Sequence, residues 1–536
     1  MRAFPAIAVA IVVLASVGLC AAYPVGPPLK LDQLAEEADV IVKAAVISSK
    51  PIQDEWFRAC PGFAAYGTRL RVVSVVKGEV AADTITFQHY GFSKAARGSE
   101  FMPQHYEFQA GRTYIVFAKK TDTEGVFRQL WKNHRAQEDQ GVILAADAEP
   151  VAADESVKDI IWVELCALLK SADPDDVVYA IRHLNEMSSG SHFKLDDFER
   201  GSALQAIRPF LSSKDKQVAT AAIVAVGADS PYLKDDYAPH WLTAIGSGRI
   251  HGFSEWQRDS NNPDARAYWQ ALAAVGDSDA PNEVRALAIR ALGRVAQPGV
   301  MDRVVRWLQD PDRLVRQAAV ILLADYAGEQ ALQLLADCAV DETAEVRTGV
   351  ARAIGYGQFD ELLPLLERLL ADRDLGVSTA AALSLISLPP GKVDTILKAH
   401  VDDAEFKSVF VNALAETDPE PYLDALAEII EKRLEPTHFW GGRIPHGLSW
   451  KILFEYLQGK SAEDLSSGSL DKYMNALEHA RFYSSSQPRD LYALYVKHGL
   501  TERAQVFREK CKATFTYDID YYFKAVDKER GIGAGE

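Results

Sequence analysis

The sequence has few cysteines, and they are far apart. Four of the five lie beyond the N-terminal segment, at Cys60, Cys166, Cys338 and Cys511, and none forms a Cys-x-x-Cys pair. Disulfide-dense modules and paired zinc sites need closely spaced cysteines. The spacing therefore excludes a disulfide-dense module, argues against iron–sulfur or thiol-redox chemistry, and predicts no metal or cofactor. Whether any of the four pair stays open.

Long apolar runs are absent after residue 19. The run Ala6–Leu19 follows Arg2 and precedes the small residues at 20–22. It is shorter than the roughly twenty residues that span a bilayer, but has the pattern of a signal peptide cleaved before Tyr23. We expect residues 1–22 to be that signal, the mature chain to have no integral membrane segment, and the protein to be exported to the periplasm, the cell surface or the medium.

An excess of positive charge is also absent. The formal net charge is −17, with 15 Lys and Arg against 16 Asp and Glu in residues 23–150, and 42 against 59 in residues 151–536. Binding to a phosphate backbone needs a basic surface. The long acidic part is therefore not expected to bind nucleic acid.

Motifs for catalysis are missing as well. There is no Gly-x-Ser-x-Gly elbow, His-Glu-x-x-His helix or phosphate-binding glycine loop. His89 and His105 lack a recognisable third ligand, so we interpret them as ordinary core or surface groups. Asp518 and Asp520 alternate as on an exposed strand and lack the oxygen-rich loop of a calcium site. We assign no catalytic residue and no metal site.

A repeat of thirty-one residues is what the sequence does contain. Four units begin at Asp279, Asp310, Asp341 and Asp372, and in each an apolar residue follows after five, nine and thirteen positions. This spacing is one face of an α-helix, and a second amphipathic helix fits into each interval. A single helical hairpin cannot enclose its apolar face, so the units are expected to stack as a solenoid.

Charged residues recur in the same register. We expect the opening aspartates to cap the first helices. We also expect the arginine that follows the recurring valine of each unit to reach the aspartate of a neighbouring unit. Ser378 replaces the arginine in the last unit, so the ladder should end there. The predicted ladder residues are Asp279, Arg285, Asp310, Arg316, Asp341, Arg347 and Asp372.

The pattern of Asp, then Val-Arg, then Ala and Leu across 279–388 resembles the HEAT-repeat family, in particular its short bacterial PBS-lyase-like form. Degenerate copies begin at Asp173, Ser212 and Asp402. We therefore predict an all-α HEAT-like solenoid over 157–462, with irregular insertions near 229–263 and 434–450, followed by capping helices and a tail over 463–536. The resemblance implies a protein that holds a partner.

Residues 23–144 have a different character. Runs such as ADVIVKAAVIS, TRLRVVSVVKG and GRTYIVFAKK are β-rich and are separated by turn residues, which predicts a small antiparallel barrel or sandwich. Their order resembles the OB-type barrel of netrin- and TIMP-like modules. Residues 145–156 are predicted to link this domain to the solenoid, which makes the protein multidomain.

Two similar stretches interrupt the repeat rhythm, GRIHGFSEW at 248–256 and GRIPHGLSW at 442–450. They are either a recognition site, in which Arg grips a carboxylate and Trp stacks on a ligand, or inter-repeat elbows with buried Trp side chains. Catalysis is a third alternative, and the flanking sequence favours the elbows. The candidate binding residues are Arg249, His251, Trp256, Arg443, His446 and Trp450.

The function that these patterns favour is an exported, non-enzymatic scaffold or adaptor that binds a protein or a cell-surface polymer through its solenoid. One alternative is an enzyme with a site at the irregular loops or at the domain junction. A second alternative is a protease inhibitor that acts through the β domain.

Overall fold

The computed structural model describes most of the chain in two compact units, divided after Val226. The described residues are 29–57, 62–93, 103–132, 140–151, 155–188, 197–226, 263–292, 299–325, 328–389, 391–403, 405–434, 447–480, 486–514 and 519–529.

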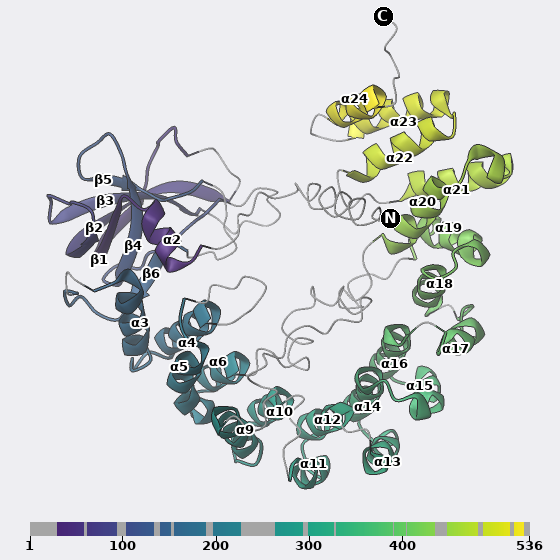
Figure 1. Ribbon diagram of the computed structural model, residues 1–536, viewed down its shortest axis with the longest axis horizontal. Coiled ribbons are helices and arrows are strands. Elements are labelled where there is room, and N and C mark those ends of the chain that lie inside the picture. The colour runs from purple at the N-terminus through teal and green to yellow at the C-terminus, as the bar shows by residue number, and fades with distance from the viewer. Residues whose placement is uncertain are drawn as a thin grey trace, which may run out of the picture. The chain divides into compact units, whose positions relative to one another are not determined.

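The first unit begins with a short helix and six strands (Figure 1). These elements are α2 (Leu31–Glu37), β1 (Val40–Pro51), β2 (Phe63–Lys77), β3 (Thr84–Phe92), β4 (Thr113–Lys120), β5 (Val126–Arg128) and β6 (Val142–Ala145). The strand order is β1-β2-β3-β5-β4-β6, and β1 also pairs with β4, so the first five strands close into a barrel. The barrel alternative is therefore confirmed over the sandwich, although β3 and β5 are parallel rather than antiparallel.

Apolar alternation explains the barrel. Along β3, Ile85 and Phe87 are buried while Thr86 and Gln88 are partly exposed, as expected of a strand with one side on a core. Strands β4 and β6 are buried along most of their length, and helix α3 (Val157–Leu168) packs against β6.

Five helical segments complete the first unit. They are α3 (Val157–Leu168), α4 (Pro174–Ser188), α5 (Arg200–Ile207), η1 (Arg208–Ser212) and α6 (Lys216–Val226). The segment predicted as a linker, 145–156, is attached to the barrel at one end and starts the helices at the other. Ala146 N donates to Glu164 Oε2 at 2.7 Å, and Val151 N donates to Ser74 Oγ at 3.0 Å. The division between the two compact units lies after Val226, so the barrel and the first helices belong to one unit.

A buried ion pair strengthens that attachment. Lys43 on β1 is only 1% exposed, and its Nζ lies 2.5 Å from Glu164 Oε1 on α3 and 3.0 Å from Asp147 Oδ1. A buried ammonium must be paired to be tolerated in the interior. The domain junction that was considered for an enzyme site is thus filled, at this point, by a structural ion pair.

The second unit contains the repeats. Figure 1 shows α10, α12, α14 and α16 side by side in one layer, with α11, α13 and α15 in a second layer. The elements are α9 (Pro263–Gly276), α10 (Asn282–Ala291), α11 (Val300–Leu308), α12 (Arg313–Leu322), η3 (Leu323–Asp325), α13 (Glu329–Cys338), α14 (Ala344–Gly357), η4 (Asp360–Leu362), α15 (Leu363–Leu370) and α16 (Leu375–Ser387). The predicted helical hairpins are confirmed.

The periodic apolar residues form the core between the two layers. All twelve predicted first-helix positions are at most 3% exposed, as are Leu335 and Leu366 in the second helices. Glycine brings two first-layer helices close together. A Cβ on Gly355 of α14 would lie 2.7 Å from the Ser384 Cβ of α16, closer than side chains pack. The absence of a side chain at Gly355 therefore sets the spacing of this junction.

Degenerate hairpins and a terminal helical bundle follow. They comprise α17 (Asp394–Ala399), α18 (Lys407–Ala415), η5 (Glu420–Tyr422), α19 (Leu423–Glu431), α20 (Leu448–Gly459), η7 (Ala462–Asp464), α21 (Ser467–His479), α22 (Ser486–Lys497), α23 (Thr501–Thr514) and α24 (Asp520–Glu529). Tyr492, Tyr495 and Phe523 are almost fully buried in one core that runs from α19 to α24. No helix in the described part of the chain is long and apolar enough to cross a membrane.

The strand predicted around Asp518 and Asp520 is wrong where the structure describes it. Asp520 is the first residue of α24, and its carboxylate accepts a 2.6 Å hydrogen bond from Arg508 Nε on α23. An acidic residue is favourable at a helix N-terminus, which competes with the strand alternation. Asp518 lies outside the described residues.

Candidate functional site at the edge of the repeat stack

Arginine and aspartate side chains form a ladder along one edge of the repeats. Each arginine comes from the first helix of a unit and reaches the aspartate that opens the next unit, twenty-five residues later. The pairs are Arg285 with Asp310 at 2.5 Å, Arg316 with Asp341 at 3.2 Å, and Arg347 with Asp372 at 2.7 Å. In the next unit Ser378 donates its hydroxyl to Leu375 O in its own helix, and the regular series ends there.

The arginines also hold the turns of their own units. Arg347 Nη1 donates to Asp341 O at 2.9 Å and to Glu342 O at 3.2 Å, while Nε and Nη2 donate to the Asp372 carboxylate. Arg316 makes the same kind of contacts with its own opening turn. Because one guanidinium fixes two successive turns, the ladder sets the register between neighbouring hairpins.

The opening aspartates do not cap the helices as predicted. Asp312 and Asp374, two residues further on, are the N-caps of α12 and α16 and accept from the free amides there. Asp310 and Asp372 instead accept the backbone N–H of those capping residues, each at 2.9 Å. This turn leaves the second carboxylate oxygen free for the arginine. At the first unit, Asp279 precedes α10, whose N-cap position is Pro281 with no side-chain cap bond.

The ladder is shielded from water, and its charges perturb one another. The side chains of Arg347 and Asp372 are 9% and 11% exposed. The Asp372 carboxylate raises the pKa of Arg347, and the Arg347 guanidinium lowers the pKa of Asp372. For Asp341, burial acts to raise the pKa, but hydrogen bonds from Thr343 and Arg316 outweigh it and lower the pKa. All three groups are therefore held in their charged forms.

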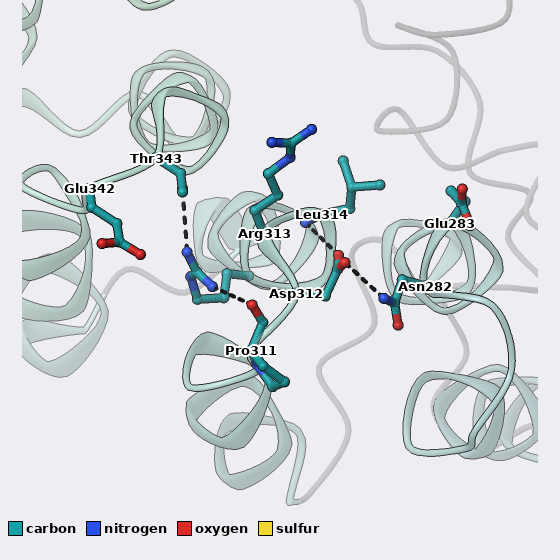
Figure 2. A pocket seen from close by; sticks show the side chains of 9 residues that line it. Asn282, Glu283, Pro311, Asp312, Arg313, Leu314, Glu342 and Thr343 are labelled. Atoms are coloured by element: carbon teal, nitrogen blue, oxygen red, sulfur yellow. Dashed lines mark hydrogen bonds between the residues drawn. The ribbon is translucent and has the colours of Figure 1, made fainter.

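A polar groove of about 490 Å³ lies above the ladder, between the openings of three successive units. Figure 2 shows Arg313 between Asn282 and Glu283 on one side and Glu342 and Thr343 on the other. The residues that line the groove are Asn282, Glu283, Pro311, Asp312, Arg313, Leu314, Arg316, Glu342 and Thr343.

The polar contacts of the groove are exposed to solvent. Asn282 Nδ2 donates to Asp312 Oδ2 at 2.8 Å, an exposed hydrogen bond that links α10 to the capping residue of α12. Arg313 is 59% exposed and pairs with Glu345 at 3.1 Å, a contact that a ligand can displace at little cost. Glu283 and Glu342 are also exposed. The arrangement can bind a ligand through hydrogen bonds and charges of both signs.

The first Gly-Arg-Ile stretch, 248–256, and residues 442–446 of the second lie outside the described residues. These include Arg249, His251, Trp256, Arg443 and His446. Trp450 is described, and it is not a surface residue: it is 4% exposed, stacks on Phe454 with a centroid distance of 4.9 Å, and donates Nε1–H to Leu477 O at 3.2 Å. Its assignment as a binding residue is corrected, because Trp450 packs in the core between α20 and α21.

The two histidines in the barrel are engaged in hydrogen bonds. His89 is 2% exposed, with Nε2 at 2.7 Å from Thr68 Oγ1 and Nδ1 at 2.8 Å from Tyr90 O. Burial lowers the pKa of His89 to about 4. His105 Nδ1 lies 3.0 Å from Pro103 O. Within the described residues, no group of three or more His, Cys, Asp or Glu side chains is arranged to hold a metal ion.

Cys166, Cys338 and Cys511 are free thiols, and Cys60 lies outside the described residues. Burial raises the pKa of both Cys338 and Cys511 to about 11. These thiols are therefore protonated near neutral pH and are poor nucleophiles.

The sequence predicted the ladder but missed the groove. Asn282 and Arg313 share one column of the repeat alignment, in which all four units have different residues, and Thr343 stands in the column before it, where two other units have Asp. No recurring pattern therefore marks these three residues as a set. The available signal was their position directly before or at the start of each first helix, where the side chains of successive units must lie near one another.

Comparison with known proteins identifies the repeats. Residues 269–353 match a family model described as HEAT repeats. No curated protein matches the chain. Two similar solved structures are a protein titled YibA of E. coli and Kap121p bound to RanGTP. The first is 17% identical, covers 50% of this chain and 87% of its own, and has a TM-score of 0.30. The second is 13% identical, covers 63% of this chain and 36% of its own, and has a TM-score of 0.34.

Proposed function

We infer, from the premise that this chain carries HEAT repeats, that it is a non-enzymatic scaffold that binds a protein partner along the edge of its second unit. The observation that carries this proposal is the polar groove above the buried ladder. Exposed Arg313 and Glu342 stand on turns whose backbones are fixed by Arg316 and Arg347. A fixed base lowers the conformational entropy that binding must overcome.

The chemistry of the groove indicates the kind of partner. Its exposed charges are mixed, with Glu283 and Glu342 on either side of Arg313. A volume of about 490 Å³ accommodates a few side chains rather than a folded domain. We propose that a partner inserts an exposed loop or terminus with both a carboxylate and a cationic side chain, and that further contacts extend along the edge.

A pull-down with charge-exchange variants tests the groove. Arg313→Glu combined with Glu342→Lys keeps the net charge and reverses the local pattern. The matched control is Glu329→Lys with Lys398→Glu, which exchanges two exposed charges on the second-layer helices α13 and α17. We expect the wild type and the control to recover the same partner from the exported fraction, and the groove variant to recover about ten-fold less. Equal recovery by all three proteins would exclude the groove as the binding site.

We also propose that the protein acts after export. The N-terminal pattern supports this, with its short apolar run followed by small residues at 20–22. Mass spectrometry of the N-terminal peptide of protein from the natural source tests it. A peptide that starts at Tyr23 is expected. A mature protein that retains the apolar run would contradict cleavage at this position.

A further inference from the structure

The outward side of the barrel in the first unit carries basic residues. Strand register places Lys50 on β1 opposite Gly67 on β2, Gly67 opposite Gln88 on β3, and Gln88 beside Arg128 on β5. Paired residues project from the same side of a sheet, and adjacent strands are about 4.8 Å apart. Thr68, the next residue on β2, is 0% exposed, so the other side of the sheet is the interior. The residues in register with Gly67 therefore point outward.

Two arginines extend this surface along β2. Arg69 and Arg71 follow Gly67 at spacings of two and four, so they share its side of the strand. Both are exposed, and neither has an ion-pair partner within the described residues. Lys50 on β1 and Arg128 on β5 also project outward, so four basic residues follow the outer surface of the barrel around these strands.

The ring of Trp56 contacts Arg128 and one further cation, Lys132. Arg128 Cζ lies 4.9 Å and Lys132 Nζ lies 4.6 Å from the centroid of the Trp56 ring, so the two charges are within about 10 Å of each other. Asp54 pairs with Arg128 at 3.3 Å, and Glu55 is an exposed acid in the same loop. Asp54 pairs with Arg128 and not with Lys132, and Lys132 has no ion-pair partner within the described residues.

An apolar side chain lies in the centre of this surface. A Cβ on Gly67 would lie 3.0 Å from Ile52 Cγ2, so Ile52 rests on the sheet where the glycine leaves room. Ile52 and Trp56 are both partly exposed. The surface thus combines aliphatic and aromatic groups with cations. We call it the basic face, formed by Lys50, Ile52, Trp56, Arg69, Arg71, Arg128 and Lys132.

We propose that the basic face binds a carboxylated polysaccharide, a chain of uronic-acid sugars. Arginine forms strong paired hydrogen bonds with carboxylates, and Asp54 already occupies one such position beside Arg128. Ring C–H groups of sugars pack on flat aromatic and aliphatic surfaces such as Trp56 and Ile52. Single-stranded nucleic acid fits less well, because it needs successive aromatic platforms for stacked bases, whereas the residues of the basic face include one aromatic side chain, Trp56.

Binding of the full chain to immobilised alginate, a polyuronate, tests the proposal. We expect binding that weakens as salt is raised, and about ten-fold weaker binding for Arg69→Gln with Arg71→Gln. The control is Lys170→Gln with Lys214→Gln, which removes two exposed positive charges from the helices and turns of the same unit. This control should stay within about two-fold of the wild type. Thermal melts of both variants establish that they fold.

The outcomes that overturn the proposal are distinct. Absence of alginate binding, or equal weakening by the two double variants, excludes a specific site on the basic face. Tighter binding to a single-stranded oligothymidylate, lost on the same Arg69 and Arg71 substitutions, assigns the face to nucleic acid instead. A Lys132→Gln variant removes one positive charge of the basic face and keeps the Trp56 ring. This variant should also bind alginate more weakly than the wild type. None of these results depends on the groove in the second unit.

Discussion

Breaking one rung of the ladder should destabilise the repeats far more than removing an exposed ion pair. Arg347→Met keeps much of the aliphatic stem but removes bonds to Asp372 and to the carbonyls of Asp341 and Glu342. It also leaves the Asp372 carboxylate, only 11% exposed, without its counter-charge. Loss of one partner from a buried pair costs about 3–5 kcal/mol.

The matched comparison is Arg313→Met, one unit earlier on the same edge. Its ion pair with Glu345 is 59% and 39% exposed on the two sides. Exposed pairs of this kind contribute about 0–1 kcal/mol. A difference of at least 2 kcal/mol between the two variants is therefore expected, in a comparison where residue type and substitution are identical.

Hydrogen exchange followed by mass spectrometry is the appropriate assay, because repeat arrays open locally as well as globally. Peptides from α14 and α16 should lose protection in the Arg347→Met variant, whereas peptides from the barrel should not change. Asp372→Asn gives the second arm of a double-mutant cycle, since an Asn side chain can still accept the Asp374 N–H. The coupling between the two positions isolates the contribution of the charge pair.

The pH dependence gives an independent check. The pKa of Asp372 is lowered in the folded state by Arg347, from an ordinary value of 3.8. A carboxylate with a depressed pKa stabilises the fold above that ordinary value, and the contribution is lost as pH falls through the folded-state pKa. The difference between wild type and Arg347→Met should therefore shrink below about pH 4. Equal protection of the Arg347→Met and Arg313→Met variants at neutral pH would refute the ladder as a source of stability.

Three further predictions follow from the packing. Trp450→Ala should cost about 3–5 kcal/mol and lower the melting temperature, and an unchanged melt would contradict its burial. Gly355→Ala should destabilise by about 1–3 kcal/mol in urea unfolding because its Cβ meets Ser384. Gly468→Ala, with open space around it, should be neutral or slightly stabilising. At pH 8, Cys338 should react with iodoacetamide much more slowly in the folded than in the urea-unfolded protein, since burial raises its pKa to about 11. Peptide mapping that finds equal rates would contradict this.

The solenoid could be predicted because its physics is local and repeated. Val284, Val315 and Val346 recur in one register, and a helix with that stripe has to bury it against the next hairpin. Arg347 and Asp372 could be paired in advance for the same reason, since each copy confirms the spacing of the others. A feature that occurs once in the chain offers no such support.

Other features depend on contacts between distant segments. The capping position at Asp312 could not be separated from Asp310 by spacing alone, because both are aspartates and only the turn geometry assigns their roles. The pairing of Lys43 with Glu164 joins residues 121 positions apart. A lysine within an apolar strand run gives no sign in the sequence of which carboxylate will meet it.

For Trp450 the flanking sequence was a better guide than the shared nine-residue pattern. The pattern suggested recognition, whereas the apolar helix that begins beside Trp450 favoured an elbow with a buried tryptophan, and Trp450 is buried. The sequence did not reveal the basic face. Lys50, Arg69 and Arg128 are ordinary charges in the sequence, and only the strand register brings them together.

The Arg–Asp ion pairs recur at successive junctions between units, whereas the close packing at glycine differs from one junction to the next. Every regular junction has the same Arg–Asp pair, so a newly duplicated thirty-one-residue unit would inherit a working charge contact with either neighbour. Close packing is not interchangeable in this way. Gly349 lies against Gln317, but the corresponding residues of the adjacent copies are Ala318 and Ala380. Removing residues 341–371 would let Arg316 face Asp372, yet would set Ala324 where Gly355 meets Ser384. In an array of identical copies, the ion pairs would allow a unit to be added by duplication. Substitutions that introduce or remove a glycine at a junction would then determine which units can pack next to each other.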